Sequence, residues 1–201
     1  MTQRKNMPDW DSFYKENKIE EMPWYEKNLD LDLEYQINSM NLTNGKFLDL
    51  GTGPGTQAIQ LEKLGFESTA SDISKSAIDK AQQLSSKVNF VVDDILNSSF
   101  PDNTFDFILD RGCFHVFEPM LRKDYLNQLK RILKDDGILF LKVMSIEEKG
   151  LPDNEGPYRF SKQEILDTFE NDFEVKEIKS TVYYGTLDPL PKALFAVITQ
   201  K

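Results

Sequence analysis

The sequence predicts an α/β protein built on one doubly wound, mostly parallel sheet of seven strands that ends in an antiparallel hairpin. Three observations predict this fold. Short apolar runs alternate with segments of helical periodicity over residues 46–144, a glycine-rich turn follows the first run, and no helix separates the last two runs. Strands that alternate with helices are joined by right-handed crossovers and pair in parallel. Strands joined without a helix pair antiparallel.

The strands are expected at 46–50, 66–71, 88–92, 105–109, 138–144, 173–184 and 193–198. Apolar residues at helical spacing predict helices around 33–40, 58–64, 77–84 and 121–133, the last of them stopped at Asp136-Gly137. Ser161 and Glu164 form a capping-box signature that starts a further helix. The strand at 138–144 is nearly all apolar, as expected for burial on both faces. Ligands of such sheets bind beyond the carboxyl ends of the strands.

Composition excludes several classes of protein. The chain has 201 residues and a net charge of −10, which fits one domain and argues against nucleic acid as a partner. Its single cysteine, Cys113, rules out an internal disulfide or a cysteine metal cluster, and we expect no metal. No apolar run reaches the length of a membrane span, and the first residues lack a secretory core, so the cytoplasm is the expected location.

Residues 1–28 form an expected arm in front of a single domain at 29–201. The arm is polar yet aromatic, and it holds both tryptophans, Trp10 and Trp24. These rings either cover an edge of the core or roof a ligand. In the second case Trp24 contacts the cofactor, and Trp10 and Tyr14 contact the substrate.

The turn after the first strand reads Asp49-Leu50-Gly51-Thr52-Gly53-Pro54-Gly55-Thr56. Glycines let a backbone approach a ligand closely, and the following helix offers free N–H groups. A dinucleotide-binding turn needs a third glycine where Thr56 stands. The acid at position 49 suits a cationic group, for which a carboxylate is a strong acceptor.

A second acid, Asp72, stands at the end of the next strand, before Ile73. It lies about 20 residues beyond the glycine turn, the spacing at which an acid meets ribose hydroxyls. The alternative is that Asp72 simply precedes the helix N-cap Ser74.

The turn at 49–56, the acid after each following strand and the closing segment 191–198 resemble the class I S-adenosylmethionine-dependent methyltransferases, which have a Rossmann-like sheet. The resemblance implies S-adenosyl-L-methionine as cofactor and S-adenosyl-L-homocysteine as product. It also implies that Gly51, Thr52, Gly53 and Gly55 cradle the cofactor while Asp49 accepts from its ammonium group. Asp94 and Ile95 are then placed at the adenine, with Asp93 as the reserve choice.

Asp110, Arg111 and His115 follow the fourth strand, where the resemblance places the methyl group. Asp110 could stabilise the sulfonium, and Arg111 could pair with Asp110 or orient an anionic substrate. His115, the only histidine, is either a general base or a packed core residue. Cys113 is expected to be a buried residue rather than a nucleophile.

The arm and the Asp110-Arg111-Gly112 run are similar to the thiopurine, thiol and tellurite-resistance methyltransferases. That similarity implies methyl transfer to a small molecule, such as a thiol or another soft nucleophile. The loop at 145–158 is expected to be either a lid or a surface insertion, with Tyr158 and Arg159 facing the substrate. The alternatives are an NAD(P)-dependent oxidoreductase and a non-catalytic protein that binds S-adenosylmethionine.

Overall fold

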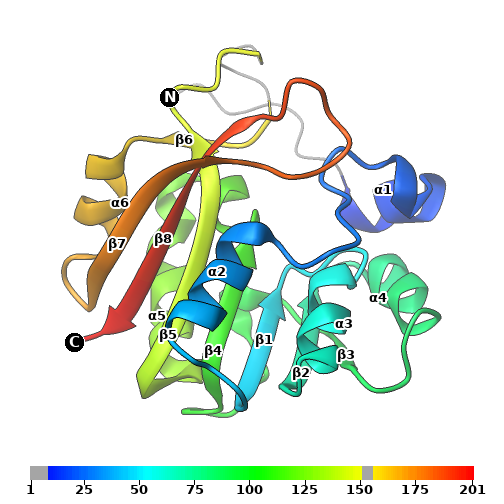
Figure 1. The fold of residues 1–201 in the computed structure, drawn as a ribbon, viewed down its shortest axis with the longest axis horizontal. Coiled ribbons are helices and arrows are strands. Elements are labelled where there is room, and N and C mark those ends of the chain that lie inside the picture. Colours follow the sequence, from blue (N-terminus) through cyan, green and yellow to red (C-terminus); the bar gives the residue numbers. More distant parts are fainter. Residues whose placement is uncertain (1–8, 151–155) are drawn as a thin grey trace.

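The computed structural model describes residues 9–150 and 156–201, and one mixed sheet forms its centre (Figure 1). The strands are β1 (Lys46–Leu50), β2 (Glu67–Asp72), β3 (Asn89–Val92), β4 (Phe105–Arg111), β5 (Leu133–Ser145), β6 (Arg159–Phe160), β7 (Phe173–Val182) and β8 (Lys192–Gln200). Their order is β3-β2-β1-β4-β5-β8-β7, with β6 beside the end of β5. The first five strands pair in parallel, and β8 runs antiparallel to β5 and β7. The predicted doubly wound sheet with its antiparallel hairpin is therefore confirmed.

Two details differ from the sequence-based expectation. β6 is an additional strand, and its two residues are too short to carry an alternating pattern. β5 begins at Leu133, although the predicted helix ran to Asp136-Gly137. Leu133 has an extended backbone and pairs with Phe105 of β4, so pairing within the sheet ends the helix before the turn signal does.

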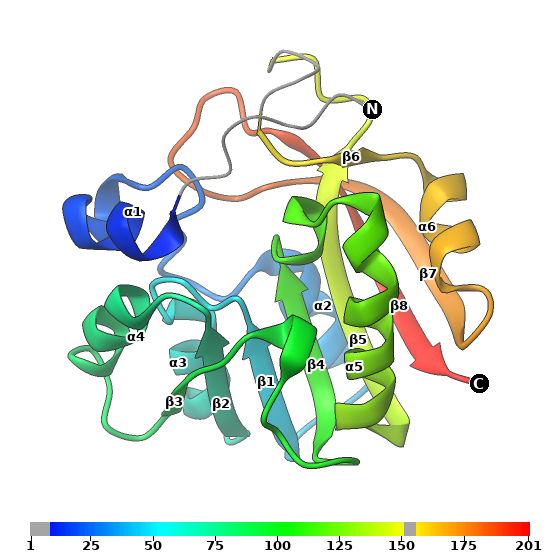
Figure 2. The same cartoon turned by 180° about the vertical axis from the view of Figure 1, so that it is seen from behind.

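Helices cover both faces of the sheet (Figures 1 and 2). They are α1 (Trp10–Glu16), α2 (Leu31–Ser39), α3 (Thr56–Lys63), α4 (Lys75–Gln82), α5 (Arg122–Ile132) and α6 (Lys162–Phe169). The short 3-10 helices are η1 (Ile19–Glu21), η2 (Ile95–Asn97), η3 (Phe114–Val116) and η4 (Pro119–Leu121). The capping box predicted at the start of α6 is confirmed, because Ser161 and Glu164 exchange both of its hydrogen bonds.

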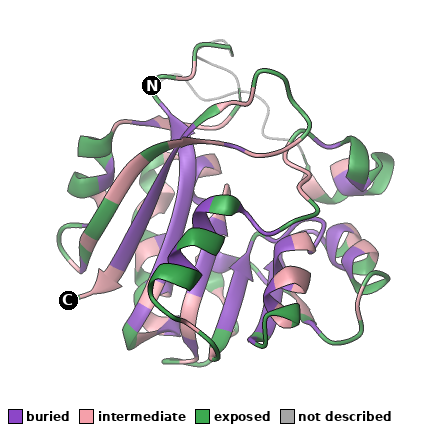
Figure 3. Ribbon diagram, in the orientation of Figure 1, coloured by how far each residue is buried: buried purple, intermediate pink, exposed green. Residues whose placement is uncertain are grey.

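The apolar core has a main cluster on each face of the sheet. On one face Tyr125 and Leu129 of α5 and Phe169 of α6 pack against β4 and β5. On the other face Leu33 of α2 packs with the rings of β1, β5 and β8, among them that of Phe140. Strand β5 is buried over nearly its whole second half (Figure 3). The predicted burial of this strand on both faces is confirmed.

The arm lies beyond the carboxyl ends of the strands, with α1 beside α4 (Figure 1). Asp11 of α1 accepts a hydrogen bond from the backbone N–H of Ser76 (2.7 Å), and Lys80 donates to the carbonyl of Asn17 (2.7 Å). In the two described ranges, no helix combines the length and the apolar character needed to cross a membrane.

Candidate active site

Three glycines shape the turn that follows β1. Gly51, Gly53 and Gly55 have φ angles of 65°, 50° and 75°, a region that favours glycine. The backbone N–H of Thr52 donates to the carbonyl of Ser71 (2.9 Å), which ties the turn to the end of β2. The turn leads directly into α3, as predicted, and its residues 52–55 are buried at the carboxyl edge of the sheet.

The carboxylate of Asp49 holds this turn in place by hydrogen bonds. Its Oδ2 accepts hydrogen bonds from the hydroxyl of Thr52 and from the backbone N–H of Ala58 (3.1 Å). The side chain is buried, and burial raises its pKa to about 6 against the opposing effect of these hydrogen bonds. Contact with the ammonium group of a cofactor stays a prediction.

Asp72 joins the glycine turn to the end of β2. One carboxylate oxygen accepts from the backbone N–H of Gly53 (2.9 Å), and the other accepts from the N–H of Ser74 (2.9 Å). Burial raises the pKa of Asp72. The next residue, Ile73, is 57% exposed despite its apolar side chain. The carboxylate of Asp72 can accept from the hydroxyls of a sugar, and the exposed side chain of Ile73 can pack on a flat base.

The acids after β3 point in different directions. Asp93 is buried, and its Oδ1 accepts from the backbone and the hydroxyl of Ser99, both at 2.8 Å. Its Oδ2 is buried with no hydrogen-bond partner among the described residues. Asp94 is exposed and caps η2, while Ile95 is buried. Asp93 therefore fixes the loop, and Asp94 is the acid that a ligand can reach.

Asp110 is fully buried at the end of β4. Its carboxylate accepts from the backbone N–H groups of Gly112, Cys113 and Phe114, and from the hydroxyl of Tyr125 (2.7 Å). Burial raises its pKa to about 6. Asp110 thus fixes the loop after β4. Its contact with the sulfonium group of a cofactor stays a prediction.

Of the two roles predicted for Arg111, pairing with Asp110 is wrong, and orienting an anionic substrate stays a prediction. Neighbouring residues of a strand point to opposite faces, and both residues belong to β4, so their side chains diverge. Arg111 pairs instead with Asp30, the N-cap of α2, with 2.9 Å between Nε and Oδ2. Its terminal nitrogens donate to the carbonyl of Trp24 (3.0 Å) and to that of Tyr184.

His115 lies in η3 and is 8% exposed. Its Nδ1 accepts a hydrogen bond from the backbone N–H of Met144 (3.1 Å), beside the hydroxyl of Tyr183 at 3.3 Å. Since a backbone N–H only donates, Nδ1 carries no proton and the neutral ring holds its proton on Nε2. The nearby Cys113 packs against Gly51, and burial raises the pKa of its thiol well above the usual value.

The arm places its rings over the glycine turn. Trp10, Phe13, Tyr14 and Trp24 lie within 5.6 to 6.4 Å of one another, measured between ring centroids. Tyr14 is 5% exposed, and a Cβ added to Gly53 would lie 2.3 Å from its hydroxyl oxygen. Burial and the carboxylate of Asp72 both raise the pKa of Tyr14. Tyr14 is thus the ring in direct contact with the turn.

Tyr158 and Arg159 lie where the loop after β5 rejoins the body. The backbone N–H of Tyr158 donates to the carbonyl of His115 (2.7 Å), and its ring lies 5.0 Å from the guanidinium of Arg122. Arg159 donates to the carbonyl of Glu148 (2.9 Å). The middle of the predicted lid at 145–158, residues 151–155, lies outside the described residues, so that prediction stays open.

Sequence reasoning missed Asp30, Lys142 and Tyr183. Lys142 is fully buried in β5, and its Nζ lies 2.6 Å from Asp30 and 2.7 Å from Asp32. The signal was present in the sequence, because Lys142 is the one charged residue in the apolar run 138–144. Its partners could not be foreseen, since they lie more than a hundred residues earlier in the chain.

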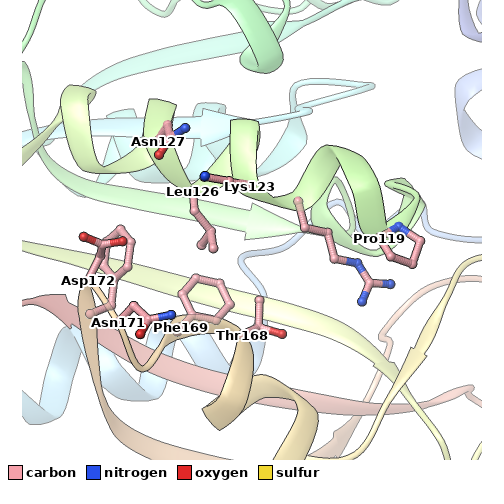
Figure 4. Close-up of a pocket in the computed structure, with 10 residues that line it drawn as sticks. Pro119, Lys123, Leu126, Asn127, Thr168, Phe169, Asn171 and Asp172 are labelled. Atoms are coloured by element: carbon pink, nitrogen blue, oxygen red, sulfur yellow. The ribbon is translucent and has the colours of Figure 1, made fainter.

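A groove of about 490 Å³ lies elsewhere, between α5 and α6 (Figure 4). Leu126 and Phe169 are among its apolar side chains, and Lys123 and Asp172 are among its charged ones. None of the predicted site residues lines it. The predicted residues gather instead beyond the carboxyl ends of β1, β2 and β4, where the strand order reverses between β1 and β4. The fold and the position of these residues are typical of an α/β protein that binds a nucleotide-type cofactor at the switch point of its sheet.

Comparisons with known proteins agree on a family. The family described as "Methyltransferase domain" matches residues 47–137. An uncharacterized methyltransferase of Schizosaccharomyces pombe, C750.03c, is 33% identical over 106 residues, which cover 51% of this chain and 73% of the relative. Human EEF1A lysine methyltransferase 2 is 27% identical over 166 residues, 77% of this chain and 64% of the relative. A probable thiol methyltransferase 2 of Arabidopsis thaliana is 28% identical over 122 residues, 58% of this chain and 54% of the relative.

Solved structures share the fold. One, reported as "Conversion of a Disulfide Bond into a Thioacetal Group during Echinomycin Biosynthesis", has a TM-score of 0.82 at 20% identity, covering 96% of this chain and 92% of that one. The Burkholderia thailandensis 1,6-didemethyltoxoflavin-N1-methyltransferase, solved with S-adenosylhomocysteine, has a TM-score of 0.67 at 19% identity, covering 85% of this chain and 78% of that one. The chain belongs to the S-adenosylmethionine-dependent methyltransferases. It spans about 64% of the length of the human relative.

The residues present fit this cofactor. Ile73 and Asp94 are exposed beyond the ends of β2 and β3, and the carboxylate of Asp72 accepts from the backbone N–H of Gly53 in the glycine turn, whose residues 52–55 are buried. A Cβ at Gly53 would lie 2.3 Å from the hydroxyl oxygen of Tyr14, so the turn needs glycine where Tyr14 covers it. An exposed apolar side chain suits a flat base, and two carboxylates suit the adenine amine and the ribose hydroxyls.

Proposed function

We propose that this protein transfers a methyl group from S-adenosylmethionine to a small-molecule acceptor, a thiol or another soft nucleophile. The observation that carries the proposal is the enclosure of the site. Thr186, in the loop between β7 and β8, donates its backbone N–H to the carbonyl of Pro23 (3.2 Å) and its hydroxyl to that of Met22 (3.2 Å). The arm therefore meets the hairpin above the sheet, which suits a small acceptor better than an extended polypeptide.

The chain's own residues would hold the cofactor as follows. Asp72 would accept from the ribose hydroxyls and Asp94 from the adenine amine. Ile73 would pack on the base, and the backbone N–H of Ile95 would donate to a ring nitrogen. The glycine turn and Asp49 would hold the amino-acid end. Trp24 and Tyr14 would exclude water from above, and Trp10 would border the acceptor. When bound, the cofactor supplies its own electrophilic methyl carbon, so the protein mainly aligns and desolvates.

The state of His115 favours an acceptor that needs no base. Because Nδ1 already accepts from Met144 and Nε2 carries the proton, neither nitrogen of the neutral ring is ready to take a proton. A thiolate is already ionised, so it suits this arrangement. The Arabidopsis relative named a thiol methyltransferase supports the same choice, while the human relative named for lysine makes a protein lysine the second candidate.

The cofactor site is tested by calorimetry with S-adenosylhomocysteine, with NADH as the control ligand. We expect Asp72→Ala to raise the dissociation constant at least about tenfold, because it removes a charge-assisted acceptor. The matched control is Asp102→Ala, an exposed acid paired with Arg131, which should bind as the wild type does. Heat from NADH, or equal binding by Asp72→Ala, would contradict the assignment.

The acceptor is tested by mass spectrometry of methylated products. The panel contains alkyl and aryl thiols, N-heterocycles and a lysine peptide, each with S-adenosylmethionine. Methylation of thiols with a rate that follows the thiolate fraction supports the proposal. Transfer to the lysine peptide alone would replace it with the second candidate, and no transfer to any acceptor would favour a non-catalytic cofactor-binding protein.

A further inference from the structure

A cluster of buried charges lies beside the proposed site and has no part in the chemistry above. Lys142 is fully buried in β5, and its Nζ lies within 2.8 Å of both carboxylate oxygens of Asp30. Asp32 accepts from Lys142 (2.7 Å), from Lys179 (3.1 Å) and from the hydroxyl of Thr181 (2.6 Å). Arg111 completes the cluster through Asp30.

Such a cluster is costly to bury. Removing charges from water costs several kcal/mol per ion, and apolar residues of similar volume often give equal or greater stability. Phe140 and Met144, which share the face of Lys142 in β5, are apolar and buried, so this face of the strand accepts apolar residues. The stability of the fold therefore does not account for the buried cluster. The fixed positions of its charges can instead orient a neighbouring side chain.

The group that the cluster orients is the guanidinium of Arg111. Asp30 holds Nε, which turns one terminal nitrogen to the carbonyl of Trp24 in the arm and the other to the carbonyl of Tyr184 in the β7–β8 loop. Only the planar fork of arginine reaches three acceptors in this way. Arg111 is thus one side chain that joins the end of β4, the arm and the hairpin.

The segment between the arm and α2 is held from its other side by α3. Gln57 accepts from the backbone N–H of Asp30 (2.8 Å) and donates to the carbonyls of Asn28 (3.0 Å) and Glu26 (3.2 Å). Gln60 donates to the carbonyl of Lys27 (2.7 Å). Asp30 is the point where the contacts from α3, β4 and β5 meet.

We propose that Asp30 and Lys142 are positioning residues that orient Arg111, so that Arg111 ties the aromatic arm to the hairpin over the site of methyl transfer. This inference rests on the proposed function for its location at that site. Asp30 fixes Nε of Arg111, and Lys142 neutralises and fixes Asp30. The two carbonyl contacts of Arg111 then keep Trp24, and with it Tyr14, above the glycine turn.

The test compares Arg111→Lys and Asp30→Asn with the control Lys179→Met. Lysine keeps the charge beside Asp30 but loses the fork, and asparagine keeps the helix cap but loses the charge. Lys179→Met removes a cation from the same cluster on the side away from the arm. Both tryptophans lie in the arm, so their emission reports its position, and hydrogen exchange of the amides at 13–25 reports its opening.

For Arg111→Lys and Asp30→Asn we expect red-shifted tryptophan emission, arm exchange about tenfold or more faster, and weaker binding of S-adenosylhomocysteine. The melting temperature should stay similar in Arg111→Lys and fall in Asp30→Asn, because Lys142 then loses a buried partner. Lys179→Met should leave arm exchange unchanged. Unchanged exchange and emission in a folded Arg111→Lys would overturn the inference, as would equal effects of Lys179→Met. Hydrogen exchange and tryptophan emission are measured without ligand, so they test this inference independently of cofactor binding. If the wild type binds no S-adenosylhomocysteine, that result refutes the proposed function alone.

Discussion

Replacing Gly53 with alanine should separate the aromatic arm from the glycine turn. The new Cβ would lie 2.3 Å from the hydroxyl oxygen of Tyr14 and 3.1 Å from its ring carbon Cζ, so the ring must withdraw. Loss of a buried aromatic contact costs about 1.5–3 kcal/mol. The left-handed φ of 50° adds about 1–2 kcal/mol for any residue with a Cβ.

Gly65→Ala is the matched control for this substitution. Gly65 also has a positive φ, at 100°, but the nearest atom to an added Cβ there is the carbonyl oxygen of Thr43, 3.7 Å away. Both variants therefore carry a backbone cost, and only Gly53→Ala also displaces Tyr14.

The assay combines tryptophan emission with calorimetry, because Trp10 and Trp24 both contact Tyr14 in the arm. We expect Gly53→Ala to shift the emission to the red and to raise the dissociation constant of S-adenosylhomocysteine at least about tenfold relative to Gly65→Ala. Equal emission and equal affinity in the two variants would refute the placement of Tyr14 over the turn.

Three further predictions concern stability. Burial raises the pKa values of Asp49 and Asp110 from 3.8 to about 6, so the folded state binds more protons than the unfolded state between these two pH values. The free energy of unfolding should therefore fall as the pH rises through that window, by about 3 kcal/mol per group. Urea titrations of Asp49→Asn should show a smaller fall than those of the wild type. Lys142→Met should cost about 3–5 kcal/mol, because it removes the fully buried cation that Asp30 and Asp32 share and leaves them only Arg111 and Lys179. The exposed Lys75→Met should cost less than about 1 kcal/mol. Ser161→Ala should cost about 1 kcal/mol in urea denaturation, because it removes the cap of α6.

Each of these predictions has an outcome that contradicts it. A difference between the wild type and Asp49→Asn that stays constant from pH 4 to pH 7 would show that burial does not shift this carboxyl. Equal costs for Lys142→Met and Lys75→Met would show that the buried cluster behaves like a surface pair. A Ser161→Ala variant as stable as the wild type would mean that the cap observed at α6 contributes nothing.

The strand–helix order and the glycine turn could be predicted from the sequence because both depend on local chemistry. Apolar periodicity defines which segments bury a face, and a positive φ needs glycine wherever the rest of the chain lies. The position of Asp72 and Asp94 at the carboxyl edge of the sheet could be predicted for the same reason, since Asp72 ends β2 and Asp94 lies two residues beyond β3.

Local patterns fail where the sheet decides a boundary. β5 starts at Leu133 because that residue pairs with Phe105, which lies far earlier in the chain. Asp136-Gly137 is a sequence typical of a helix end, but pairing of β5 with β4 ends the helix earlier. The short strand β6 exists because Arg159 and Phe160 meet the end of β5, and two residues carry no pattern of their own.

The sequence by itself determined the class of fold, the glycine turn after β1 and the acids at the ends of the strands, because these are properties of short segments. Only the tertiary structure decided the partners of the charged groups and the position of the arm. Arg111 meets Asp30 across 81 residues of sequence, and Lys142 meets the same carboxylate across 112. Such pairs form only when the sheet has brought distant segments into contact, and no spacing along the chain encodes that distance.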